Sequence, residues 1–87
     1  MSATIHIQKK PNVRLGIYIK NTKKGIEIVD IDVYNGNLLR RGDIITHLNE
    51  KHYKSAKDAS KFIISSSSFD MKLLKQEIAL YSPLLDF

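Results

Sequence analysis

Short runs of alternating apolar and polar residues recur along the chain, and this period of two is typical of half-buried β-strands. Runs of this kind, the fifth of them very short, predict strands at residues 3–8, 17–21, 26–31, 44–48, 52–53 and 69–75. The second and third runs are separated only by a turn that ends at Gly25. Because these two strands lie so close in the sequence, they predict an antiparallel hairpin.

The period changes after Ser55, where the sequence indicates a helix. Ala59 and Ile63 stand four residues apart, which places them on one face of a helix. Ser55 is a suitable N-cap residue, and Asp58 three residues later completes an acidic variant of the capping box. A run of four serines then offers the backbone competing hydrogen bonds. The pattern therefore predicts one helix over about residues 55–65.

Length and composition limit the class of protein. Eighty-seven residues, 43% of them hydrophobic, are enough for one small domain with its own core. The lack of cysteine excludes a disulfide framework and zinc ligation by thiolates. The sequence contains no transmembrane run or signal peptide. We therefore expect a cytoplasmic protein, or a domain of a larger one, that is either free or at the inner face of a membrane.

Charge and motifs narrow the function further. Fourteen Lys and Arg against nine Asp and Glu give a net charge of +5, but the cations are dispersed along the sequence. Aromatic residues do not interleave with them, as the stacking of bases would require, so we expect no nucleic-acid partner. The three histidines share no metal-ligand spacing, and no glycine-rich phosphate loop occurs. We accordingly expect no metal, no cofactor and no enzymatic activity.

The order of these elements, with an apolar-glycine-apolar step before the second strand, resembles the PDZ domain. The matching residues are Lys10-x-x-x-Arg14-Leu15-Gly16-Ile17, Ile26-x-Ile28-x-x-Ile31, Leu39-x-x-Gly42-Asp43-x-Ile45-x-x-Leu48-Asn49, and Ala59 with Ile63. Together they cover residues 3 to about 75. The resemblance implies an α+β fold, namely a small antiparallel β-sandwich or partly open barrel of five to six strands capped by one main helix.

The resemblance also implies how the chain is divided. We expect a PDZ-like domain over residues 1–75 and a C-terminal tail over residues 76–87. PDZ domains commonly have a short first helix after the third strand. Here the chain between Ile31 and Leu39 is short, so we expect that helix to be reduced or absent.

A binding site for the C-terminal carboxylate of a partner protein is a further implication. In PDZ domains the loop before the second strand cups this carboxylate with converging backbone N–H groups. The implied carboxylate-binding residues are Lys10, Arg14, Leu15, Gly16 and Ile17. The implied hydrophobic pocket for the terminal side chain consists of Leu15, Ile17, Ile19 and Ile63, and the rest of the peptide groove of Tyr18, Lys20, Ala56, Ala59 and Ser60. Arg14 stands where the family often has glycine, and it would place an additional charge near the carboxylate.

The first groove-facing position of the helix decides which ligands fit. Alignment on Ala59 places Ala56 there, and a shift of one residue would place Ser55 there instead. PDZ domains that select Ser or Thr two residues before the ligand terminus carry histidine at this position. Neither register supplies a histidine, so we expect a preference for ligands that end hydrophobic-x-hydrophobic.

Two functions of different class are consistent with the sequence. The favoured one is an adaptor or scaffold module that adds the C-terminal tail of a partner as a strand between residues 17–21 and helix 55–65. The alternative is a basic surface that docks on anionic lipid membranes. Its cations would be Lys9, Lys10, Arg14, Lys23 and Lys24.

The tail carries the ligand pattern that the groove is expected to prefer. Leu85-Asp86-Phe87 ends the sequence with apolar residues at both selected positions, so head-to-tail self-association is one expectation. In the other, the apolar tail residues Ile78, Leu80 and Tyr81 cover a patch of the same molecule.

Overall fold

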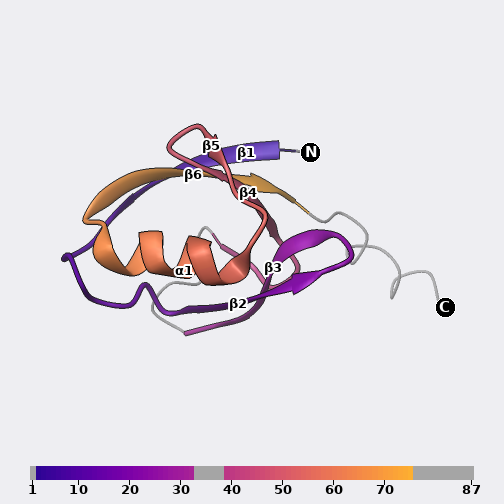
Figure 1. Ribbon diagram of the computed structural model, residues 1–87, viewed down its shortest axis with the longest axis horizontal. Helices are drawn as coiled ribbons and strands as arrows, with labels where there is room; N and C mark the ends of the chain where they lie inside the picture. Colours follow the sequence, from indigo (N-terminus) through magenta and orange to yellow (C-terminus); the bar gives the residue numbers. More distant parts are fainter. Residues whose placement is uncertain (1, 33–38, 76–87) are drawn as a thin grey trace, which may run out of the picture.

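The computed structural model describes residues 2–32 and 39–75 of the chain (Figure 1). Its elements in chain order are β1 (Ser2–Gln8), β2 (Ile17–Thr22), β3 (Gly25–Ile31), β4 (Ile44–Leu48), β5 (Lys51–His52), α1 (Ala56–Ser65) and β6 (Ser68–Leu74). Each strand and the helix lie within one residue of the predicted bounds. The expectations for the short first helix and for the tail of residues 76–87 fall outside the described residues.

All six strands belong to one antiparallel sheet with an open arrangement. The order is β1-β6-β4-β3-β2, and β5 pairs with β4. Because β1 and β2 are the two ends of this order, the sheet is not closed into a barrel. The predicted α+β fold, with six strands and one main helix, is confirmed in its open form. In the part of the chain that the structure describes, no helix is long and apolar enough to cross a membrane.

The core forms where α1 packs on the sheet. Along β6, Phe69, Met71 and Leu73 are buried while the residues between them are exposed, which is the period of two that a half-buried strand requires. From α1, Ala59 and Ile63 are 0% and 4% exposed. Residues four apart share a helix face. The apolar face of α1 and the apolar face of β6 therefore both lie in the core.

Two tight turns require unusual backbone conformations. Gly25 opens β3 with φ +130°, and a Cβ at this position would lie 3.0 Å from Ile44 Cγ2. Glycine is therefore the residue that fits. Between β4 and β5, Asn49 and Glu50 have φ 51° and 71°, which is the left-handed pair of a type I′ turn. Glu50 adopts a conformation that glycine would adopt without strain.

Asp43 joins three segments of the fold. It is 2% exposed, and its carboxylate accepts a hydrogen bond from the Arg40 N–H at 3.0 Å and pairs with Lys75 Nζ at 2.6 Å. The adjoining backbone is bonded to β3, since the Gly42 N–H donates to the Ile28 carbonyl at 2.8 Å and the Ile28 N–H donates to the Asp43 carbonyl at 2.9 Å. The Gly-Asp step of the sequence thus connects β3, β4 and the end of β6.

Candidate functional site

The β2 strand has one edge directed at α1. Among the described strands it pairs with β3 alone, and its other edge faces the helix (Figure 1). The Gly16 carbonyl accepts a hydrogen bond from the Asp32 N–H at 2.7 Å. In a trans peptide the following N–H points the opposite way, so the Ile17 N–H points away from β3. Backbone direction alternates along a strand, and the N–H and C=O of Ile19 therefore also face the open edge.

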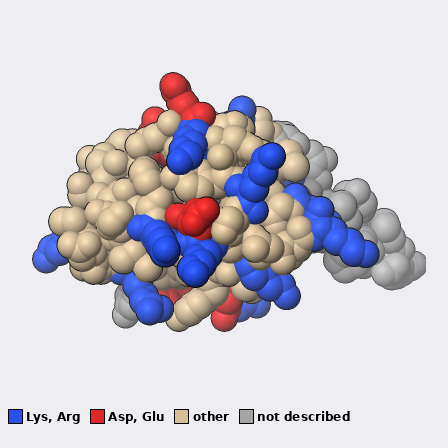
Figure 2. Space-filling model, viewed as in Figure 1, with Lys and Arg blue, Asp and Glu red and all other residues tan. Residues whose placement is uncertain are grey.

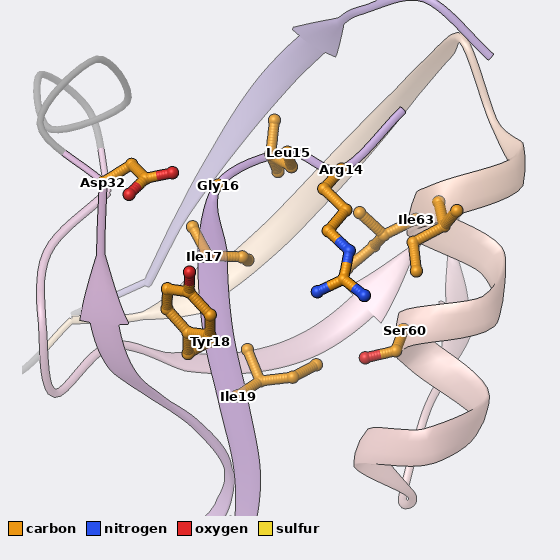
Figure 3. Close-up of a pocket in the computed structure, with 10 residues that line it drawn as sticks. Arg14, Leu15, Gly16, Ile17, Tyr18, Ile19, Asp32, Ser60 and Ile63 are labelled. Carbon is orange, nitrogen blue, oxygen red and sulfur yellow. The ribbon is translucent and has the colours of Figure 1, made fainter. Parts of the chain in front are cut away.

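A cavity of about 230 Å³ lies between this edge and α1 (Figure 3). Its lining residues are Arg14, Leu15, Gly16, Ile17, Tyr18, Ile19, Asp32, Ser60, Ile63 and Ile64. The structure brings together all four residues of the predicted hydrophobic pocket. Ile63 belongs to the core, and Leu15, Ile17 and Ile19 pack against it. An extended chain along β2 would therefore have backbone partners on one side and an apolar recess beneath its side chains.

Loop residues 14–17 close one end of the cavity, and their conformation depends on Gly16. Its φ is +94°, a left-handed value that side chains with a Cβ rarely adopt. Leu15 and Ile17, on either side, are partly buried against the core. The flanks of the loop are thus held by packing, while its backbone borders the cavity.

Lys9 connects the chain before the 14–17 loop to the C-terminal end of α1. The sequence did not indicate this role. Lys9 Nζ donates hydrogen bonds to the Ile64 carbonyl at 2.9 Å and to the Lys10 carbonyl at 3.1 Å. The Asn12 N–H donates to the same Ile64 carbonyl at 2.8 Å. A cation at the C-terminal end of a helix also interacts favourably with the helix dipole. Desolvation at this position lowers the pKa of Lys9 below its ordinary value.

The charged residues at the cavity differ from the predicted set. Arg14 lines the cavity, and Figure 3 shows its guanidinium extending from the loop over the space between β2 and α1. Lys10 is exposed and does not line the cavity. Asp32 does line it, from the far side of Gly16, although sequence reasoning gave it no role. The cation nearest the loop is therefore Arg14, and an acidic residue stands opposite.

The helix places the groove residues in a definite register. Within α1, Ser60, Ile63 and Ile64 line the cavity. Ala59, predicted to line the groove, is 0% exposed and belongs to the core, because its neighbour Ser60 occupies the face turned toward β2. Ser55 caps the helix by accepting a hydrogen bond from the Asp58 N–H at 3.4 Å. The alternative register, with Ser55 and Ala59 facing the groove, would use a capping residue and a buried one.

The other residues predicted to line the groove lie at the margins of the cavity or outside it. Tyr18 is 51% exposed and borders the cavity, whereas Lys20 is exposed and lies farther along β2 without lining it. Ala56, the first residue of α1, is partly buried against the core and also does not line the cavity. Its N–H donates to Asn21 Oδ1 at 2.8 Å. This bond joins the start of α1 to β2 at the end of the groove away from the loop.

Charge and metal-ligand geometry add two observations. Figure 2 shows basic side chains spread over the face that carries α1 and β2, with acidic side chains between them. On this face the cations do not form one continuous patch. Within residues 2–32 and 39–75, no three His, Cys, Asp or Glu side chains gather closely enough to hold a metal ion.

An open antiparallel sheet whose edge strand faces a single helix, with a glycine loop at one end of the intervening groove, is the architecture of a PDZ domain. The chain has this fold. Among solved structures it is similar to the fifth PDZ domain of InaD, in 10 mM DTT, with a TM-score of 0.69 and 20% sequence identity over 88% of this chain and 99% of that one. This likeness confirms the fold predicted from the sequence motifs. Comparison with models of known protein families gives no match, and no curated protein matches significantly.

Proposed function

We propose that this domain is a protein-interaction module that binds the C-terminal tails of partner proteins. The tail adds to the sheet as a strand between β2 and α1, antiparallel to β2, with its carboxylate at loop residues 14–17. In this position the tail would extend the sheet by one strand. Adaptor and scaffold proteins use modules of this kind to hold a partner without chemical change.

The observation that carries the proposal is the direction of the Ile17 N–H. It points away from β3, as the Asp32-to-Gly16 hydrogen bond requires, and it borders a cavity that Arg14 also lines. Backbone N–H groups that converge on one point make an anion site. A guanidinium beside them adds a charge-assisted hydrogen bond. A chain terminus carries the anion and the extended backbone that such a site fits.

The ligand side chains that enter the groove are expected to be apolar. The terminal side chain would rest among Ile17, Ile19 and Ile63, which supply an apolar surface without a polar partner for it. Two residues earlier, the neighbouring helix position is Ser60 and the helix starts at Ala56. Small side chains leave room there, and α1 contains no histidine to bond a ligand hydroxyl. The proposed ligands therefore end hydrophobic-x-hydrophobic.

Selection followed by mapping tests this function. Peptides with four random C-terminal residues and a free carboxylate are selected on the domain, and the best one is titrated into ¹⁵N-labelled protein. We expect apolar terminal residues, and the largest amide shifts at residues 14–20 and 60–64. Shifts centred on residues 51–54 and Asp58, where a second recess lies, or the absence of any selected sequence, would contradict the proposal.

A further inference from the structure

The register of a strand added to β2 follows from the position of the loop. The loop precedes Ile17, so a ligand whose carboxylate lies there runs antiparallel to β2. The backbone groups of Ile17 and Ile19 face the open edge, which pairs the terminal residue with Ile17 and the residue two before it with Ile19. The penultimate residue then lies opposite Tyr18, and the residue three before the terminus lies opposite Lys20.

These last two ligand side chains point away from α1. Directly paired residues of neighbouring strands project to the same face of a sheet. Ile17 and Ile19 pack toward the core, while Tyr18 and Lys20 are exposed on the opposite face. Figure 3 shows the same division, with Tyr18 on one side of β2 and the helix on the other. The face of β2 that points away from α1, called the outer face, can therefore contact the penultimate ligand residue and the residue three before the terminus.

The charges on this outer face change along β2. Lys20 lies beside the ligand position three before the terminus, and its β3 partner Glu27 lies one strand farther away. Near Tyr18 the charges are acidic: Asp30 is its partner on β3, and Asp32 borders the same cavity. Arg41 forms an ion pair with Asp30 at 2.9 Å. Asp32, which bonds Gly16 from the end of β3, adds a second acidic charge near the penultimate ligand residue, also one strand beyond β2.

Arg14 does not reverse this pattern, because its side chain extends on the helix side of β2 (Figure 3). A basic penultimate side chain would lie beside the Tyr18 ring, whose face attracts cations. The Asp32 carboxylate, one strand farther away, would attract it as well. An acidic side chain three residues before the terminus would meet the Lys20 ammonium. Like charges directly opposite each other on neighbouring strands are unfavourable, so a basic residue opposite Lys20 is disfavoured. An acidic penultimate residue lies opposite the uncharged Tyr18 and is disfavoured only by the more distant Asp32 carboxylate.

We propose that the outer face of β2 selects partner tails by charge order, with an acidic residue three before the terminus and a basic penultimate residue. This inference rests on the proposed function and specifies its ligand class as acidic-hydrophobic-basic-hydrophobic. Lys20 and Asp32 are the residues that set the order.

Two peptides of identical composition test the charge order. One ends Glu-Leu-Lys-Val and the other Lys-Leu-Glu-Val, with the same preceding residues and free carboxylates. Their net charges are equal, so attraction to the net positive charge of the domain cancels in the comparison. We expect the first peptide to bind about three- to tenfold more tightly in low salt, because the residue opposite Lys20 is attracted in one peptide and repelled in the other. Added salt should reduce the ratio because the charges are exposed.

Two variants of Lys20 and one control variant test whether Lys20 causes the preference. Lys20→Glu should remove most of the preference, and Lys20→Gln should do so without creating a repulsive pair with Glu27 on β3. Lys24→Glu changes the net charge equally but lies in the β2–β3 turn, away from the groove. It should leave the ratio of the two affinities unchanged.

The outcomes separate the inference from the proposed function. Equal affinities for the two peptides, with binding lost when their carboxylates are amidated, would overturn the charge order and leave terminus recognition intact. A ratio that Lys20→Gln leaves unchanged, or that Lys24→Glu changes as much as Lys20→Glu does, would overturn the role of Lys20. Absence of binding by either peptide would overturn both proposals.

Discussion

Ile63 serves the core and the candidate groove at once. Its side chain is 4% exposed, packs in the core and lines the cavity. Truncation to alanine would cost about 2–4 kcal/mol of folding free energy, which would confuse loss of fold with loss of binding. Ile63→Val is the better probe. It should destabilise the domain by about 1 kcal/mol and weaken peptide binding about two- to fourfold through lost pocket contact.

Ile45→Val is the control for this change, since Ile45 is 1% exposed in the core and does not line the cavity. Chemical denaturation and peptide titration are measured on both variants. Similar destabilisation with weakened binding only in Ile63→Val is expected. Equal peptide affinity in the two variants would show that the terminal side chain does not rest on Ile63.

Substitution of Asp43 tests whether its buried carboxylate, which joins β3, β4 and the end of β6, stabilises the fold. Asp43→Asn removes the charge that pairs with Lys75, and it should lower the free energy of unfolding by about 2 kcal/mol. Asp30→Asn removes an exposed ion pair with Arg41, whose side chains are 54% and 72% exposed, and should cost less than about 1 kcal/mol. Urea denaturation at neutral pH compares the two. A larger loss for Asp30→Asn would contradict the structural role assigned to Asp43.

The sequence indicated the apolar residues of the site and Arg14, but not Lys9 or Asp32. Periodicity places Ile17, Ile19 and Ile63 on inward faces, and the PDZ resemblance is what assigned them to a pocket. Lys9 could not be predicted, since its role arises from a contact with Ile64, 55 residues away in the sequence. Ala59 was assigned to the groove because a helical period does not say which of two adjacent inward positions faces the core.

At the scale of elements, the position of α1 is fixed at both ends by β2 and by the preceding loop. Lys9 and Asn12 bond the Ile64 carbonyl at one end. Asn21 Oδ1 accepts from the Ala56 N–H at the other. These bonds join the two ends of α1 to β2 and to the loop before β2, in addition to the apolar contacts of Ala59 and Ile63 with the core.

Asn21→Ala should therefore loosen the groove at the end away from the loop. It removes the acceptor for an N–H at the helix start, which should cost about 1 kcal/mol of stability, as the loss of a capping side chain does. Peptide affinity should fall as well, because the separation of β2 and α1 is less well defined. Asn21→Asp keeps an acceptor oxygen and should restore both quantities. Wild-type stability and affinity in Asn21→Ala would show that this bond does not position α1.

Element bounds were predictable to within one residue because turns and caps are local signals. The Ser55 cap, the serines from Ser65 to Ser68 at the end of α1 and the Gly25 turn each act on adjacent backbone. Sheet order was not available from these signals. The PDZ resemblance implied only that residues 17–21 lie opposite the helix. The order of the strands comes from the structure, and it matters because it leaves β2 at an edge.

At the scale of the whole molecule, the central claim is that this fold recognises a chain terminus. The sheet has two edges, β1 and β2, and of these β2 lies beside α1 and the glycine loop. Strand addition alone would accept any extended segment with suitable side chains. Recognition of a terminus requires the carboxylate, which the Ile17 N–H and Arg14 would bind.

Calorimetric titration with one selected peptide, prepared with a free carboxylate and as the C-terminal amide, tests this claim most directly. Amidation removes the charge and replaces one acceptor oxygen, while it leaves every side chain and the strand backbone unchanged. A hydrogen bond to a charged group contributes about 1.5–3 kcal/mol, against about 1 for a neutral one. Because the amide weakens the bonds from both the Ile17 N–H and Arg14, it should bind at least about tenfold more weakly. Equal affinity of the carboxylate and the amide would contradict the account.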